Sequence, residues 1–359
     1  MENNRDFKDL ATYQEISSQP GSVAAAVAAV SEQADRILAI WSERQYRQII
    51  VTGCGSTYFL SIGAASLFQM LTGITARAAP ASELLLDPKQ IYATDAAPVL
   101  LVAVSRSGAT SETLRAVQSF QKAALGDVLT ITCSPDNDLS RMGRVNIVLT
   151  AAAEKSVAQT RSFSSMWVAA CTVAGTFVQE RMLLDQLERL PEVSRRVTEA
   201  SDEPLRSLGS DLSLDRIYFL GSGFRHGLAR EASLKMKEMS LTHAEAFHFM
   251  EFRHGPMSMV DENTLIVGLL SDDPHGHERA VLTEMQALGA RLLLLSEAEV
   301  QGILADSIIF DSGLDEIVRS ALYMPPFQYL ALGRAVAKGV NPDQPRNLTA
   351  VVYLDNTYR

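Results

Sequence analysis

Residues 231–238, EASLKMKE, place two glutamates and two lysines among alanine, leucine and methionine. If this segment is helical, positions three and four apart share a face, so Glu231, Lys235 and Glu238 line one stripe. Such a charged stripe can face either solvent or a pocket. The same pattern is also typical of an amphipathic surface helix with paired charges. The segment by itself leaves both interpretations open.

A second polar group, SRSGATSE (105–112), follows the apolar run PVLLVAVS (98–105). Hydroxyl side chains beside a glycine at a helix N-terminus suit an anion, because free backbone N–H groups point outward and the helix dipole favours negative charge. The run GCGST (53–57) follows another apolar segment and has a similar composition. The alternative is an ordinary serine or threonine N-cap with no ligand.

Nucleotide and metal sites have weaker support. GCGSTY lacks the third glycine of the dinucleotide-binding pattern GxGxxG, and no GxxxxGK[ST] phosphate loop occurs. The stretch 238–256 is rich in histidine and glutamate, but its spacing matches no common zinc pattern. The potential ligands there are His243, Glu245, His248 and His254. We therefore expect neither a metal nor a cofactor.

The elements that must position these residues alternate between strand and helix. Apolar runs predict strands at 49–53, 98–105, 127–134, 145–150, 216–222, 264–271, 290–296 and 307–312. Long helical stretches are predicted at 156–183 and 190–208. Continuous apolar strands alternating with helices indicate an α/β fold with parallel sheets covered on both faces. Ligands of such sheets bind beyond the carboxyl ends of the strands, which is where GCGST and SRSGAT lie.

The series of strands occurs twice. RQIIVTGCGSTYFL (47–60) aligns with DRIYFLGSGFRHGL (215–228), and later strands of the two halves correspond as well. This internal duplication predicts two similar domains, at 46–184 and 213–340. A helical arm (1–45) precedes them, the region between them is roughly 185–212, and a tail (341–359) follows.

Composition and charge exclude several classes of protein. A net charge of −10 and a pI near 5.2 argue against a general nucleic-acid binder. No apolar run reaches the roughly 18 residues of a membrane span, and the N-terminus lacks the apolar core of a signal peptide. Cys54, Cys133 and Cys171 are scattered, as in proteins of a reducing compartment. We expect a soluble, cytoplasmic protein with neither nucleic-acid nor membrane partners.

Several motifs, in the same order along nearly the whole chain, resemble SIS-domain (sugar isomerase) phosphosugar proteins. The closest likeness is to the isomerase half of glucosamine-6-phosphate synthase and to related aminosugar-phosphate isomerases/deaminases. The motifs are YQEISSQP (13–20), GCGST, SRSGATSET, VAQTRSF (157–163), EASLKMKE, THAEAFHFMEFRHGP (242–256) and DQPRNL (343–348). The resemblance implies two tandem SIS domains, each a flavodoxin-like three-layer sandwich with a parallel sheet flanked by helices on both faces.

The resemblance also implies a role for each matching position. Glu238 matches the glutamate that moves a proton between C1 and C2, and Lys235 and Glu231 match residues lining the same pocket. His254 matches the histidine implicated in ring opening, which the neighbouring subunit supplies in that family, so a homodimer is implied. The tail would close the active site. A phosphorylated sugar or aminosugar would be held by Gly55, Ser56, Thr57, Ser105, Arg106, Ser107, Thr110, Val157 and Gln159.

Departures from the synthase shift the expected chemistry. The chain begins with Met1-Glu2 at the arm, so we expect no glutaminase domain, whose nucleophile is an N-terminal cysteine. Arg106 stands where the synthase has glutamine, and Gln159 where it has serine. Ala350 occupies the place of the lysine that forms a Schiff base with the open sugar. The missing amine favours direct enediol chemistry or loss of an existing amino group.

We therefore expect an aminosugar-phosphate isomerase/deaminase that converts, for example, glucosamine 6-phosphate to fructose 6-phosphate and ammonia. A deglycase acting on fructosamine 6-phosphates and a plain ketose/aldose phosphate isomerase are alternatives within the enzyme class. A non-catalytic phosphosugar sensor is the alternative from another class. A sensor needs only the phosphate cradle, whereas the presence of Glu238 and His254 favours an enzyme.

Overall fold

The computed structural model describes residues 7–92, 97–273 and 275–354. The chain forms two compact units, each containing one sheet. Within the described ranges, the first-sheet unit comprises residues 21–92, 97–153, 161–188 and 349–354, and the second-sheet unit comprises residues 7–20, 154–160, 189–273 and 275–348. Short segments that are distant in the sequence thus complete each unit.

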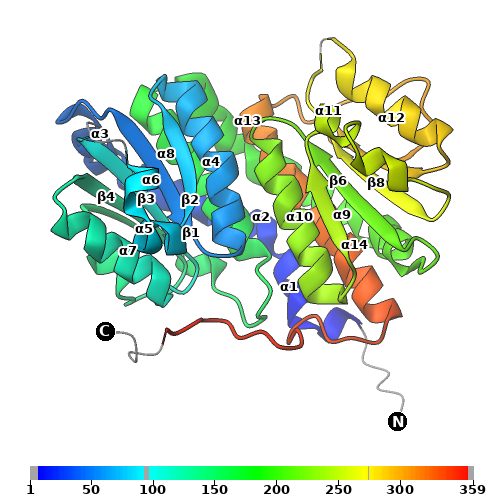
Figure 1. The fold of residues 1–359 in the computed structure, drawn as a ribbon, viewed down its shortest axis with the longest axis horizontal. Coiled ribbons are helices and arrows are strands. Elements are labelled where there is room, and N and C mark those ends of the chain that lie inside the picture. The colour runs from blue at the N-terminus through cyan, green and yellow to red at the C-terminus, as the bar shows by residue number, and fades with distance from the viewer. Residues whose placement is uncertain (1–6, 93–96, 274, 355–359) are drawn as a thin grey trace. The chain divides into compact units, whose positions relative to one another are not determined.

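The first-sheet unit holds five parallel strands in the order β2-β1-β3-β4-β5 (Figure 1). They are β1 (Gln48–Gly53), β2 (Ala76–Pro80), β3 (Val99–Ser105), β4 (Gly126–Thr132) and β5 (Val145–Val148). Helices α3 (Ala34–Ser42), α4 (Ser56–Thr72) and α8 (Arg161–Val178) cover one face. Helices α5 (Ala81–Leu86), α6 (Pro88–Ile91) and α7 (Ser111–Lys122) enclose the core on the other. The central strand β3 and its neighbour β1 are buried along their whole length, as their continuous apolar runs require.

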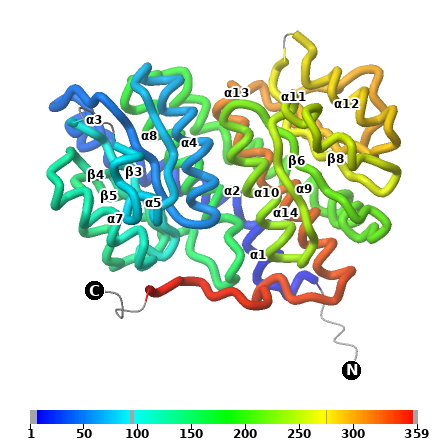
Figure 2. Tube along the Cα trace, viewed as in Figure 1, coloured from blue at the N-terminus to red at the C-terminus, as the bar shows by residue number. Residues whose placement is uncertain are grey.

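The second-sheet unit repeats this plan, and its chain runs from green to orange in the trace of Figure 2. Its strands, in the order β10-β9-β8-β6-β7, are β6 (Arg216–Gly221), β7 (Ala244–Phe247), β8 (Thr264–Leu269), β9 (Arg291–Ser296) and β10 (Asp306–Ile309). Helices α10 (Arg225–Ser240) and α14 (Met324–Ala337) pack on one side, and α11 (Phe249–Phe252) and α12 (His277–Ala287) on the other. The remaining helices are α1 (Ala11–Ser17), α2 (Gln19–Ser31), α9 (Arg181–Ser210) and α13 (Glu316–Arg319).

Both sheets place the first strand of the unit between its second and third strands, which is the flavodoxin-like order. The prediction of two similar α/β halves with parallel sheets is thereby confirmed. Strands β2 and β7 were not predicted. Each is a short edge strand paired only with the first strand of its sheet, and their sequences, ARAAP and AEAF, lack an apolar run. Edge strands are partly solvated and do not need one.

Three predicted helix boundaries were wrong. Residues 156–160 form a loop, and α8 runs only from Arg161 to Val178, short of the predicted end at residue 183. Helix α9 runs from Arg181 to Ser210 and passes through Pro191 and Pro204, where sequence reasoning began the helix near residue 190. Its apolar residues recur at helical spacing and several of them, such as Leu187 and Leu190, are buried, which outweighs the local cost of the two prolines.

Candidate functional site

The loop after β1 is a tight turn that leads directly into α4. A Cβ atom on Gly53 would lie 2.4 Å from the Thr57 hydroxyl, and Gly55 has a positive φ of 57°. The Thr57 hydroxyl accepts a hydrogen bond from the Cys54 amide (2.9 Å) and donates to the Cys54 carbonyl (2.9 Å). Thr57 therefore builds the turn, and the buried Ser56 is left as the first residue of the helix.

Three hydroxyl groups gather in the loop between β3 and α7. The Ser105 hydroxyl accepts a hydrogen bond from the Gly108 amide (3.2 Å) and lies 3.5 Å from the Thr110 hydroxyl. The Ser107 hydroxyl accepts from the Ala109 amide (3.2 Å). Thr110 is the N-cap residue of α7, yet its side chain makes no capping hydrogen bond. The interpretation of this loop as an ordinary side-chain N-cap is thus wrong for Thr110, and its hydroxyl stays within the loop.

Asn137 supports this loop and was missed by sequence reasoning. Gly108 has a φ of +64°, and a Cβ atom there would lie 1.9 Å from the Asn137 side-chain oxygen. The Asn137 amide donates to the Thr132 hydroxyl (3.1 Å) and the Ser134 carbonyl (2.6 Å). The sequence signal that could have found Asn137 is its position just after the predicted strand 127–134, at the same carboxyl edge of the sheet as the loop after β3.

The C-terminal tail contacts the same loop, within the first-sheet unit. The Arg106 guanidinium approaches the Ala350 carbonyl at 3.5 Å, so two positions where the sequence departs from the synthase meet. The Ser111 amide donates to the Val352 carbonyl (3.4 Å), and the Leu354 amide donates to the Ser111 hydroxyl (3.2 Å). Tail residues 350–354 thus lie along the first turn of α7.

Helix α10 in the second-sheet unit buries two of the three charged residues of EASLKMKE. The side chains of Glu231 and Lys235 are 0% exposed, whereas that of Glu238 is 18% exposed. The apolar residues Ala232 and Met236 on the same helix are also buried. The interpretation as a solvated surface helix is therefore wrong for this segment.

Lys235 links the two carboxylates. Its ammonium lies 3.4 Å from the Glu231 carboxylate and donates a hydrogen bond to the Glu238 carboxylate. Burial by itself lowers the pKa of Lys235, but the charges of Glu231 and Glu238 outweigh it and raise that pKa above its ordinary value. Lys235 is therefore a fixed cation, and Glu238 is the one member of this group of three whose side chain is partly exposed.

Val157 and Gln159 lie on a loop, 154–160, that other parts of the second-sheet unit hold in place. The buried Glu15 on α1 accepts hydrogen bonds from the amides of Lys155 (2.6 Å) and Ser156 (3.2 Å). The Val157 amide donates to the Asp343 carbonyl (3.0 Å). The side-chain oxygen of Gln159 is buried and has no hydrogen-bond partner among the described residues. Such an acceptor suits a hydroxyl group of a ligand.

His254 is exposed, on the turn that follows α11. The preceding Arg253 pairs with Glu284 through two hydrogen bonds of 2.7 Å, and Phe249 and Phe252 are fully buried. The segment is thus anchored, while the His254 imidazole makes no hydrogen bond or ion pair with the part of the chain that the structure describes. The structure brings Glu231, Lys235 and Glu238 together, and it does not bring His254 to them.

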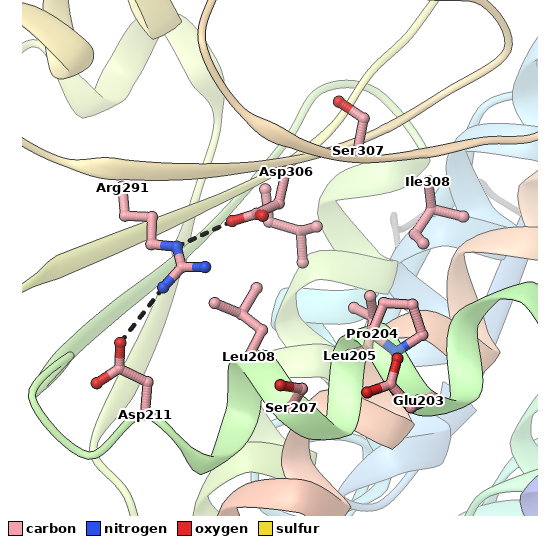
Figure 3. Close-up of a pocket in the computed structure, with 11 residues that line it drawn as sticks. Glu203, Pro204, Leu205, Ser207, Leu208, Asp211, Arg291, Asp306, Ser307 and Ile308 are labelled. Carbon is pink, nitrogen blue, oxygen red and sulfur yellow. Dashed lines mark hydrogen bonds and ion pairs between the residues drawn. The ribbon is translucent and has the colours of Figure 1, made fainter.

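A cavity of about 460 Å³ in the second-sheet unit lies away from these residues (Figure 3). Arg291 and Asp306 on its wall begin β9 and β10, so it lies at the amino ends of the strands, opposite the edge where sheets of this class bind ligands. The Arg291 guanidinium is held by Asp306 (2.9 Å) and Asp211 (3.3 Å). We therefore do not assign the candidate site to this cavity.

Within residues 7–92, 97–273 and 275–354, no group of three or more histidine, cysteine, aspartate or glutamate side chains is placed to hold a metal ion. No helix in these ranges is both long and apolar enough to cross a bilayer.

Comparisons with known proteins agree with the arrangement of the two sheets. Glutamine–fructose-6-phosphate aminotransferase [isomerizing] from Aeropyrum pernix is 30% identical over 95% of this chain and 57% of the relative. The corresponding protein from Methanothermobacter thermautotrophicus is 29% identical over 89% of this chain and 54% of the relative. The chain thus spans about half the length of the curated relatives it matches.

Solved structures share the fold along the whole chain. Tagatose-6-phosphate ketose/aldose isomerase from Escherichia coli superposes with a TM-score of 0.85 at 22% identity, covering 98% of both chains. Glucosamine-6-phosphate deaminase from Thermotoga maritima gives a TM-score of 0.76 at 23% identity, covering 96% of this chain and 100% of the other.

The family model for the SIS domain matches residues 44–174 and 213–304, which include most strands of both sheets. These matches account for the duplicated strand order and for the loops that follow β1 and β3. The chain therefore belongs to the SIS-domain family and is similar to the isomerase domain of glutamine–fructose-6-phosphate aminotransferase.

Proposed function

We propose that this protein is a phosphosugar isomerase/deaminase that transfers a proton between C1 and C2 of a hexosamine 6-phosphate or a related sugar phosphate. The observation that carries the proposal is the buried group on α10. Lys235 is fully buried between two carboxylates, and of these only Glu238 is partly exposed. A buried cation that costs desolvation free energy, beside one reachable carboxylate, is typical of a functional site rather than of a stabilising surface pair.

Glu238 acts as the base in this proposal. Its carboxylate takes the proton from C2 of the open-chain sugar, leaving an enediol(ate), and returns the proton to C1. The Lys235 ammonium keeps a positive charge beside the reacting atoms and stabilises the negative charge that develops on oxygen. The fully buried Glu231 balances that cation and fixes its position.

The phosphate group binds the loop between β3 and α7. Ser105, Ser107 and Thr110 offer their hydroxyls in one compact loop, and the N-terminus of α7 favours an anion. Arg106 on the same loop adds a positive charge. Ser56 at the start of α4, together with Gly55 and Thr57 of the preceding turn, contributes to the same substrate site. Val157 and Gln159 contact the sugar, for which the buried oxygen of Gln159 is the supporting observation.

Ala350 favours deamination or plain isomerisation over transfer of a new amino group. With an aminoaldose phosphate, proton transfer from C2 to C1 gives a 2-imino sugar. Water then adds at C2 and ammonia leaves, so the products are a ketose phosphate and ammonia. A relative of the same fold is named glucosamine-6-phosphate deaminase, and another is named tagatose-6-phosphate ketose/aldose isomerase. Removal of an amine from a fructosamine-type 6-phosphate is a further variant of this chemistry.

His254 serves the site of a second copy of the chain in this proposal. Its exposed imidazole, on a well-anchored turn, is free to enter a partner's site and exchange protons with the ring oxygen. The tail (341–359) closes the site from the side of Arg106, in keeping with the contact between Arg106 and Ala350. A cytoplasmic location fits this chemistry, because sugar phosphates are intracellular metabolites.

The proposal is tested by incubating the purified protein with a panel of hexosamine 6-phosphates, fructosamine 6-phosphates and ketohexose 6-phosphates. Ammonia release and the interconversion of ketose and aldose are followed together, and binding is measured by calorimetry. Turnover of at least one substrate with solvent-proton exchange at C1 or C2 is expected. Tight binding across the panel without turnover would overturn the enzyme and favour a phosphosugar sensor.

Sharing of a site between two copies is tested by mixing. Glu238→Gln and His254→Asn variants, each inactive alone, are unfolded, combined and refolded together. Random pairing makes about half of the dimers mixed, and each mixed dimer would hold one intact site out of two. Up to about a quarter of the wild-type activity should therefore return. No recovery, with mixed dimers demonstrated by mass, would contradict donation of His254.

A further inference from the structure

Two histidines that are not part of the group formed by Glu231, Lys235 and Glu238 stack on one another. His226 lies in the first turn of α10, and His248 follows β7 as the N-cap residue of α11. Their ring centroids are 3.8 Å apart, and the ring planes differ by 20°. The stack therefore joins the helix that carries Lys235 and Glu238 to the segment that leads to His254.

The surroundings of the pair suit uncharged rings. The Nδ1 atom of His226 is buried and has no hydrogen-bond partner among the described residues. The ring does form a hydrogen bond with the backbone of Phe247. The charged groups that act on the pair are Arg230 on α10 and Glu251 on α11. The positive charge of Arg230 lowers the pKa of both histidines, whereas Glu251 raises the pKa of His248 only.

Protonation would disrupt this contact. Burial, together with His248 and Arg230, lowers the pKa of His226 to about 4. Burial also lowers the pKa of His248, although Glu251 partly offsets it. Burial opposes a charge on either ring, and two imidazolium rings in face-to-face contact also repel each other, so the stacked arrangement belongs to the neutral pair.

The rest of the segment is held mainly from the other side. Phe249 and Phe252 belong to the apolar core on the α12 face of the second sheet, and Arg253 pairs with Glu284 on α12. The His226–His248 stack is instead a contact with α10, on which the proposed base lies. The stack thus adds a side-chain contact with α10 at the point where β7, which itself packs on α10, leads into the His254 turn.

We propose that the His226–His248 stack positions the turn that carries His254 against helix α10, and that it does so only while both imidazoles are neutral. The pair consists of positioning residues, since neither is assigned to contact the substrate. The expected effect of this positioning on activity rests on the proposed role of His254.

The test compares His226→Phe, which keeps an aromatic ring on His248 but cannot titrate, with His226→Ala, which removes the stack. Hydrogen exchange of the amides of residues 249–255 is measured at pH 7 and pH 4.5 and corrected for the intrinsic rates. In the wild type, the protection of these amides should fall about tenfold at the lower pH. In His226→Phe it should change little, and in His226→Ala it should be low at both pH values.

Activity gives the second readout, as the pH profile of kcat/KM from pH 4 to 8. The acid side should be steeper in the wild type than in His226→Phe, with unchanged binding of inorganic phosphate. Equal protection in all three proteins, or identical pH dependence of the wild type and His226→Phe, would overturn the inference. The exchange result needs no turnover and therefore decides the positioning role even if the proposed reaction fails. If His226→Ala does not fold, His248→Phe replaces it and should behave like His226→Phe.

Discussion

The ammonium of Lys235 lies 3.4 Å from the carboxylate of Glu231, and both side chains are 0% exposed. One turn of helix further on, the same ammonium donates to Glu238, which is 18% exposed. One buried cation thus connects a structural carboxylate with a reachable one. This asymmetry distinguishes the proposed base from its neighbour, because only a reachable carboxylate can exchange a proton with a substrate.

Replacing Glu238 by glutamine should reduce kcat by about 10²- to 10⁴-fold, because the amide cannot accept the C2 proton. Steady-state kinetics on the substrate identified in the panel checks this. The control is Glu203→Gln, an exposed carboxylate on α9, which should leave kcat unchanged. Unaltered turnover in Glu238→Gln would remove Glu238 as the base.

Lys235→Met should destabilise the fold by roughly 3–5 kcal/mol, because it leaves the fully buried Glu231 without its cation. The double variant Lys235→Met/Glu231→Gln should recover a large part of that loss, since no uncompensated charge remains. Urea unfolding of the wild type, both single variants and the double variant measures the coupling. Additive losses would mean that the two side chains do not interact across 3.4 Å as described.

Gly108→Ala should weaken phosphate binding by at least tenfold. The residue has a φ of +64°, and the added Cβ would meet the Asn137 side chain at 1.9 Å, so the loop that carries the three hydroxyls must shift. Calorimetry with inorganic phosphate and with the sugar phosphate checks the effect. The matched control is Gly21→Ala in α2, where a Cβ meets nothing within 4 Å and about 0.5–1 kcal/mol of stabilisation is expected.

Stability should depend on pH through His226. Its pKa is lowered from 6.5 to about 4, so between these values the unfolded chain binds the proton more tightly than the folded chain. The contribution of His226 is therefore complete above pH 6.5 and is lost as the pH falls towards 4, by roughly 2–3 kcal/mol. The slope of unfolding free energy against pH in this window should decrease in His226→Phe. An unchanged slope would mean that His226 titrates normally in the folded chain.

Ala350→Lys restores an amine at the tail position that forms a Schiff base in the synthase. Borohydride added in the presence of a ketose phosphate should then trap a covalent adduct on residue 350, detected by peptide mass. The wild type should give none at this position. The double variant Ala350→Lys/Gly108→Ala is the control, because weaker phosphate binding should reduce the adduct. An adduct at position 350 that forms equally in both variants would show a reaction unrelated to the phosphate site.

The sequence by itself determined the α/β class, the duplication and eight of the ten strands found in the part of the chain that the structure describes, because buried parallel strands need unbroken apolar runs. It also determined which residues of EASLKMKE share a face, since helical spacing is local. The sequence did not predict the edge strands Ala76–Pro80 and Ala244–Phe247, because these half-exposed strands carry no apolar run.

Only the tertiary structure decided which charges are buried. Helical spacing cannot distinguish the solvated stripe of a surface helix from the buried pair of Glu231 and Lys235, because burial depends on what packs around the helix. The support of Gly108 by Asn137, the contact of Arg106 with Ala350 and the stack of His226 on His248 join positions far apart in the chain. Such contacts are fixed by where the strands and loops meet in space, and local residue patterns do not encode them individually.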